Sequence, residues 1–172
     1  MLKTYFNMTL AKLEKKYSQT NQSLVNIEAS RTAFSVALFS DVTFKCYGPI
    51  ASNSNIIYKH VFLNMGGSYS VDTGIFTVPR SGVYSIAVTI YSDAGSPGRS
   101  LAACASLQVN GQVVVQSREA NKDDQEDSAT IAVVLQLMAG DKVAVNLPTG
   151  CFLCEYSSYF NTFSAFLLYA TE

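Results

Sequence analysis

The chain has 172 residues, which is enough for one domain with a sizeable core and a short appendage. Its net charge of −1 argues against nucleic acid and anionic membranes as partners, because both select clustered Lys and Arg. Apolar residues make up 48% of the chain, but no run approaches the ~20 residues that span a bilayer. We therefore expect a soluble protein without membrane insertion, with surplus apolar surface hidden between subunits.

The N-terminal segment leaves the cellular location open. Residues 1–6 do not read as a secretory signal, because a single Lys precedes no continuous apolar core and no small-residue cleavage site follows. Taken literally, this favours the cytosol. Against it, the tripeptides that begin at Asn7 and Asn21 match the N-glycosylation pattern, although such tripeptides also occur by chance.

Residues 3–29 show the only clear helical period of the sequence. Apolar or large residues are separated alternately by four and three positions, at Phe6, Leu10, Leu13, Tyr17, Thr20, Leu24 and Ile27. So narrow a stripe cannot bury itself alone, and it predicts a coiled coil, weakened by Tyr17 and Thr20. The alternative is a helix packed on its own domain. We expect residues 1–30 to form this helical segment and residues 31–172 to form a globular domain.

After Ser30 the period changes to two, and turn residues recur to the end of the chain, which is typical of an all-β sandwich. Residues 48–55 are rich in Gly, Pro and Asn and predict a loop. Asn110-Gly111 is the strongest hairpin signal, because both residues tolerate positive φ. Ala139-Gly140-Asp141 predicts a second tight turn. Strands are expected at residues 32–39, 56–64, 75–78, 82–92, 102–109, 112–118, 128–137, 142–147 and 162–170.

The middle of the chain carries a spaced motif of aromatic residues, Asn and Gly. Its six positions are Tyr58, Asn64, Tyr69, Phe76, Gly82 and Tyr84. This spacing closely resembles the signature of the globular head of complement component 1q. That family usually continues with two aromatic residues where Ile86 and Val88 stand here, which keeps the strand face apolar.

Three further blocks extend the resemblance over residues 32–170. They are an opening strand at residues 33–36, a late turn at residues 135–143, and a last strand at residues 162–169, where Ala165 replaces the usual Gly. Without a Gly-X-Y repeat, the chain resembles the collagen-free, cerebellin-like branch. The residues expected to form the family core are Phe34, Tyr58, Asn64, Gly66, Tyr69, Gly74, Phe76, Pro79, Gly82, Tyr84, Gly140, Asp141, Phe163 and Phe166.

The resemblance implies a ten-stranded antiparallel jelly roll that assembles into compact homotrimers, as tumour necrosis factor ligands do. A weak helical seam beside an apolar β domain gives the sequence its own reason to assemble. Candidates for the buried trimer axis are Tyr58, Phe76, Tyr84, Phe166 and Tyr169. Each of them fits equally well in the core of its own domain.

Four cysteines, Cys46, Cys104, Cys151 and Cys154, allow several kinds of chemistry. The single Cys151-Phe-Leu-Cys154 pair lacks the second half of a zinc site and is expected in a loop, unlike a thioredoxin-type motif. In an extracellular domain the four could form two disulfides in any of three pairings. We expect at least one disulfide.

The sequence offers little for catalysis. His60 is the only histidine, has no nucleophile pattern beside it, and is expected on a strand surface. One histidine also cannot build the metal site of a cupin-type enzyme. The carboxylates of residues 123–127 fit a solvated loop better than a calcium site. The resemblance leaves calcium open near a trimer apex, with no residues assigned, and we expect no other cofactor.

We therefore predict a secreted, non-enzymatic recognition module whose trimeric head binds a receptor, a glycan or a microbial surface, in the manner of innate immunity proteins. Multivalency would raise a modest affinity per site. The alternative is a cerebellin-like or tumour necrosis factor-like ligand for a cell-surface receptor. Selectivity is expected in loops 48–55, 93–100 and 121–127, which are polar or rich in Gly or Asp.

Overall fold

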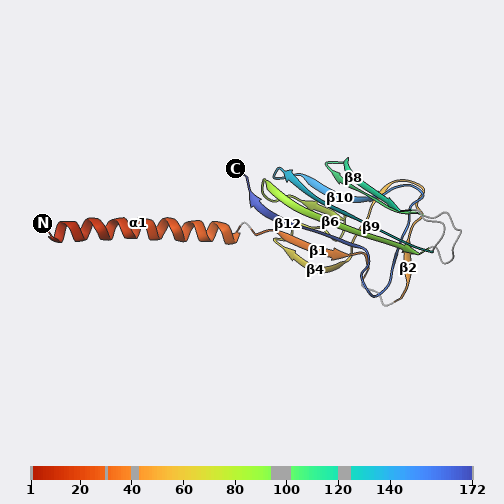
Figure 1. The fold of residues 1–172 in the computed structure, drawn as a ribbon, viewed down its shortest axis with the longest axis horizontal. Helices are drawn as coiled ribbons and strands as arrows, with labels where there is room; N and C mark the ends of the chain where they lie inside the picture. Colours follow the sequence, from red (N-terminus) through yellow and green to blue (C-terminus); the bar gives the residue numbers. More distant parts are fainter. Residues whose placement is uncertain (1, 30, 40–42, 94–101, 120–124, 172) are drawn as a thin grey trace. The chain divides into compact units, whose positions relative to one another are not determined.

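A computed structural model describes residues 2–29, 31–39, 43–93, 102–119 and 125–171 (Figure 1). Its contacts divide the chain into two compact units, Met1–Arg31 and Thr32–Glu172. The first unit consists of helix α1, Leu2–Ala29. The strands of the second are β1 Ala33–Ala37, β2 Lys45–Tyr47, β3 Ser54–Asn55, β4 His60–Met65, β5 Ile75–Thr77, β6 Gly82–Asp93, β7 Ala103–Val109, β8 Gln112–Glu119, β9 Glu126–Leu137, β10 Lys142–Leu147, β11 Leu153–Glu155 and β12 Thr162–Ala170.

Two five-stranded antiparallel sheets and the two-stranded sheet β11-β2 form the β unit. Sheet 1 has the order β4-β1-β12-β6-β9, and sheet 2 has the order β3-β10-β7-β8, with β5 also paired to β10. Strands far apart in the sequence are therefore neighbours, as in a jelly roll. The expected all-β jelly-roll sandwich with an N-terminal helix is confirmed.

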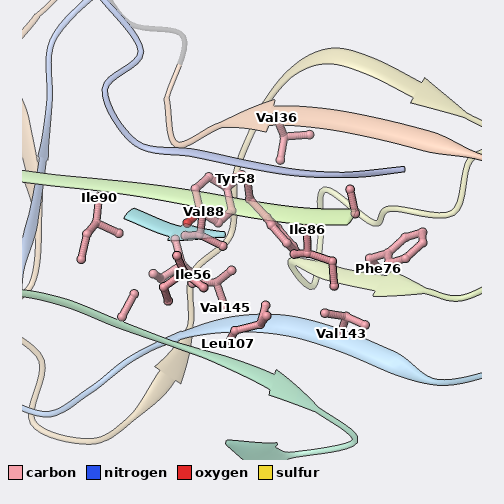
Figure 2. Close-up of a cluster of buried hydrophobic side chains, with 14 of the residues drawn as sticks. Val36, Ile56, Tyr58, Phe76, Ile86, Val88, Ile90, Leu107, Val143 and Val145 are labelled. Carbon is pink, nitrogen blue, oxygen red and sulfur yellow. The ribbon is translucent and has the colours of Figure 1, made fainter. Parts of the chain in front are cut away.

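The core lies between the inner faces of the two sheets. Strand β6 alternates buried and half-buried residues along most of its length, because one face meets the other sheet. Figure 2 shows Ile86 and Val88 of β6 pointing towards Leu107 of β7 and Val143 and Val145 of β10. Apolar residues at every second position thus close the sandwich.

The hairpin between β7 and β8 confirms the Asn110-Gly111 prediction. Both residues have positive φ, +53° and +79°, and Val109 pairs with Gln112 across the turn. Asn110 also holds the second predicted turn, because its Nδ2 donates to Asp141 Oδ1 over 2.9 Å and its Oδ1 accepts from the Lys142 amide over 2.9 Å. The two turns are locked together at one end of sheet 2.

Three sequence expectations for the strands were wrong. Residues 56–59 precede β4 and are not part of a strand, since Ile56 and Tyr58 turn into the core. The expected loop 48–55 ends in β3, which pairs with β10. Cys154 lies in β11, opposite β2, and not in a loop. Strands of two or three residues are too short to show an alternating pattern.

Candidate functional site

Part of the outer face of sheet 1 is uncharged and mainly apolar, and several of its large side chains are exposed. Strand register places one row across the sheet at Met65, Ala33, Phe166, Ser85 and Val134, and a second row at Leu63, Ser35, Ser164, Ala87 and Ala132. Neither row contains a charged residue. Phe166 is 49% exposed and Val134 is 60% exposed, although both lie on a sheet rather than in a loop. A contiguous apolar face of this kind indicates a protein interface.

An aromatic cluster continues this face along the edge strand β4. The His60 ring stacks on Tyr159 with ring centres 4.5 Å apart, and Phe62 lies edge-on to both rings. Tyr159 has a φ of +57°, which is rare for a bulky residue. His60 lies on strand β4, as expected, and is half-buried in this cluster. Its place in the cluster could not be read from the sequence, because Tyr159 is 99 residues away along the chain.

The five candidates for a trimer axis separate into two groups. Tyr58, Phe76 and Tyr84 are fully buried between the sheets, so of the two alternatives for them the core of their own domain holds. They lie on inward-facing positions, which the partner sheet already covers. Phe166 and Tyr169 of β12 are exposed, and Phe166 lies in the first outer row.

The signature residue Asn64 acts within the domain, at the turn that follows β4. Its Nδ2 donates to the Tyr69 carbonyl over 2.9 Å, and its Oδ1 accepts from the Tyr69 amide over 3.2 Å. The turn between them uses Gly66 and Gly67, both with positive φ. Asn64 therefore replaces a pair of strand hydrogen bonds with side-chain ones.

Most of the other residues expected in the family core are also structural, but Phe166 was wrongly placed there, because it is 49% exposed on the outer face of sheet 1. Phe34 contacts Tyr69, Phe76 and Phe163 with ring centres about 5 Å apart. The Tyr84 hydroxyl donates to the Arg80 carbonyl over 2.7 Å. Gly74 and Gly140 take positive φ, and Asp141 caps the turn after β9 by accepting from the Met138 amide. Pro79 is exposed beside this turn. The signature thus describes the sandwich and its turns, and no ligand site.

Two disulfides use all four cysteines. Cys46 is joined to Cys154 across the β2–β11 pair, and Cys104 of β7 is joined to Cys151. The two cysteines of the Cys151-Phe-Leu-Cys154 motif therefore belong to different disulfides. The sequence had left this pairing open.

A buried polar node, formed by Glu155 at the end of β11 and Asn161, was not predicted from the sequence. The Glu155 carboxylate is 1% exposed and accepts from the amides of Phe160 and Asn161 over 2.7 and 3.0 Å. Asn161 is fully buried, donates from Nδ2 to the Cys154 carbonyl and accepts at Oδ1 from the Tyr91 amide. These bonds fix the turn that carries Tyr159.

Helix α1 exposes the side chains of the predicted seam. Phe6, Leu13 and Tyr17 are 65%, 60% and 75% exposed, and Leu10, Leu24 and Ile27 are exposed as well. Asn7 and Asn21 lie on the helix with exposed side chains, and their glycosylation stays a prediction. Within the described residues, no helix is long and apolar enough to cross a membrane.

One end of the β6–β9 pair gathers acidic and tyrosine side chains. The Tyr156 hydroxyl donates to Asp93 Oδ2 over 3.1 Å. Burial, followed by the nearby carboxylates of Glu126 and Asp93, raises the pKa of Tyr91. In the part of the chain that the structure describes, no three metal-binding side chains converge, and calcium remains without assigned residues. Most of predicted loops 93–100 and 121–127 lies outside the described residues.

Comparison with known proteins agrees with this architecture. Residues 33–168 match the model of the C1q domain. Among solved structures, the globular domain of zebrafish complement 1qA protein is similar with a TM-score of 0.60 and 18% identity, over 82% of this chain and 99% of that one. Eiger TNF from S. frugiperda gives a TM-score of 0.61 and 16% identity, over 83% and 96%. Murine APRIL gives 0.57 and 14%, over 80% and 99%. At such identities the solved structures show a shared fold alone, whereas the domain match covers most of the chain, which therefore belongs to the C1q domain family.

Proposed function

We propose that this chain is a secreted, non-enzymatic recognition or signalling ligand that works as a homotrimer. The trimeric head binds a cell-surface receptor, a glycan or a microbial surface, and a role in innate immunity or in cerebellin-like signalling follows from the same design. The observation that carries the proposal is the apolar outer face of sheet 1, centred on Phe166.

Covering the outer face of sheet 1 with another copy of this chain is more favourable than leaving its apolar side chains exposed to water. Its two rows combine large side chains with small ones, which allows another surface to approach closely. Leu63 and Met65 extend the same face to the edge of the sheet at β4. Burial of apolar surface gives roughly 25 cal/mol per Å², so a face of this kind favours association.

The helix supports the same assembly. Its seam residues are exposed in the single chain, and a narrow apolar stripe with alternating spacing of three and four residues is covered by packing against other helices of the same kind. Joining the heads through the helices raises the effective concentration of each head for its neighbours.

The two disulfides support an extracellular location, because disulfides form and persist in oxidising compartments. One joins β2 to β11, whose hydrogen-bonded ladder covers three residue pairs, and the other joins the turn before β11 to β7 of the sandwich.

A pair of variants tests the proposed contact. Phe166→Asp places a charge in the centre of the outer face of sheet 1, and we expect it to convert trimers to monomers in sedimentation velocity. The control is Val113→Asp on β8 of sheet 2, because Val113 is 54% exposed and Phe166 is 49% exposed. If Phe166→Asp stays trimeric, or both variants dissociate alike, the contact is not on sheet 1.

A further inference from the structure

A polar hollow lies on sheet 2. Its volume is about 320 Å³, at the lower end of the ~300–1,000 Å³ of small-molecule sites. Strands β7 and β8 and the turn before Cys151 surround it. Strands β7 and β8 belong to sheet 2, and β8 is its edge strand (Figure 1). The proposed trimer contact lies on sheet 1, so the two sites are on different sheets.

Among the described residues that line the hollow, Arg118 is the charged one. It pairs in register with Cys104, and its side chain is exposed. Within the described residues, no ion pair of Arg118 is found. The planar guanidinium of an arginine matches a carboxylate through two parallel hydrogen bonds.

Gln116 and Thr149 add neutral hydrogen-bonding groups to the lining. Thr149 is held in place by Asn53, whose Oδ1 accepts from the Thr149 amide over 2.9 Å and from its hydroxyl over 3.0 Å. The Thr149 hydroxyl donates its proton to Asn53, so its lone pairs remain to accept from a ligand hydroxyl. Gln116 offers both a donor and an acceptor.

Apart from Ser117, the remaining described lining is apolar. Pro148 and the Cys104–Cys151 disulfide present carbon and sulfur surface beside the polar groups. A sugar ring has the same combination of a C–H face and hydroxyl groups. A carboxylate on that ring would complete the match with Arg118.

Asn146 carries an unsatisfied acceptor, its Oδ1, in the row of sheet 2 that contains Gln116. Register aligns Asn146, Ser106 and Gln116 across β10, β7 and β8. Asn146 is 6% exposed, and its Oδ1 has no hydrogen-bond partner among the described residues. A buried acceptor without a partner is costly, and a ligand hydroxyl or a bridging water that reaches past Gln116 would satisfy it.

We propose that this hollow binds an acidic sugar of the hexuronic acid class, with the carboxylate on Arg118 and ring hydroxyls on Gln116 and Thr149. The inference rests on the proposed recognition function and names its ligand class. Because the hollow is on sheet 2, each head of a trimer would present one copy, and a polyuronate would bind with avidity.

The test is an NMR titration of the full chain with methyl glucuronide and, as the matched ligand, methyl glucoside, which lacks the carboxylate. We expect the glucuronide to bind at least about tenfold more tightly and to shift the amide signals of residues 104–106, 116–118 and 148–151. Arg118→Gln should weaken glucuronide binding about tenfold, and Thr149→Val should weaken both ligands. Arg80→Gln, the same change at an exposed arginine away from the hollow, should have no effect.

Equal binding of the two sugars, no binding of either, or an Arg118→Gln variant that binds as the parent chain does would overturn the proposal. Sedimentation of the same samples separates this failure from failure of the proposed function. If the chain is a trimer and binds neither sugar, only the proposed ligand class is refuted. If the chain is a monomer and binds glucuronide through Arg118, only the proposed trimer is refuted.

Discussion

The hydroxyl of Tyr69 forms hydrogen bonds with both the backbone amide and the backbone carbonyl of Tyr58. It accepts from the Tyr58 amide over 3.0 Å and donates to the Tyr58 carbonyl over 3.1 Å. The hydroxyl of Tyr58 itself is buried and has no hydrogen-bond partner among the described residues. Two signature tyrosines 11 residues apart therefore have opposite roles: one satisfies the backbone, and the other fills space.

Replacing each of these tyrosines by Phe should give opposite results. Tyr69→Phe removes the partner of two buried backbone groups and should lower the free energy of unfolding by about 1–3 kcal/mol. Tyr58→Phe removes an unsatisfied hydroxyl and should leave that free energy unchanged or raise it. Urea denaturation of the two variants measures both. An equal loss in both variants would mean that the Tyr58 hydroxyl has a partner.

Alkaline pH should destabilise the domain through the same pair. Burial raises the pKa of Tyr69 to about 12 and raises the pKa of Tyr58 as well. The unfolded chain releases these protons near the ordinary value of 10.0, while the folded chain retains them. The contribution of these two tyrosines to the free energy of unfolding is therefore constant below about pH 10 and falls as the pH rises towards 12.

Denaturation curves at a series of pH values check this dependence. Tyr58→Phe should make the fall above about pH 10 shallower, because one fewer proton is retained on folding. A parent curve that is flat up to about pH 11 would show that the two tyrosines ionise freely in the folded chain.

Glu155→Gln should destabilise the turn between β11 and β12. Both carboxylate oxygens accept from backbone amides, and an amide side chain has only one oxygen, so its NH₂ group would face a backbone N–H. We expect a loss of about 1–3 kcal/mol, together with faster hydrogen exchange at Phe160 and Asn161. Glu119→Gln on the exposed end of β8 is the control, and an equal effect there would refute a specific role for Glu155.

Gly74→Ala should cost more than Gly111→Ala. Both glycines have positive φ, +69° and +79°, so an alanine at either is strained by about 1–2 kcal/mol. A Cβ at Gly74 would also collide with the Ile56 carbonyl oxygen, whereas nothing lies within 4 Å of one at Gly111. Thermal unfolding should place Gly74→Ala clearly below Gly111→Ala, and equal midpoints would show that the collision relaxes without cost.

The sequence predicts the features that depend on local pattern. The Asn110-Gly111 hairpin follows from two residues that accept positive φ, and the alternation of β6 follows from one buried face. Phe163 and Phe166 were both expected in the core, but they are three positions apart on β12, and the structure places Phe163 inside and Phe166 on the outer face of sheet 1.

The sequence does not reveal which apolar face meets the other sheet and which meets another subunit. Tyr84 is aromatic and lies in the core, and Phe166 is aromatic and exposed, and their residue types do not distinguish the two environments. The hollow beside Arg118 combines β7 and β8 with a turn that begins 30 residues after Arg118, at Pro148. The Glu155 node lies at the end of a strand of three residues. Only the folded chain brings those groups together.

Deleting residues 1–30 should weaken the trimer without unfolding the head, because the helix and the β domain form separate compact units. The truncated chain should keep its β-sheet circular dichroism spectrum. The concentration at which half of its trimers dissociate should be about tenfold or more higher than for the full chain. Loss of the β spectrum would mean that the helix is part of the domain core.

Sedimentation velocity of the unmodified full chain at micromolar concentration tests the central claim most directly. The apolar outer face of sheet 1 predicts a single species of three times the 18.7 kDa of one chain. A single species of 18.7 kDa would show that this face remains in water, and it would contradict the proposed trimer.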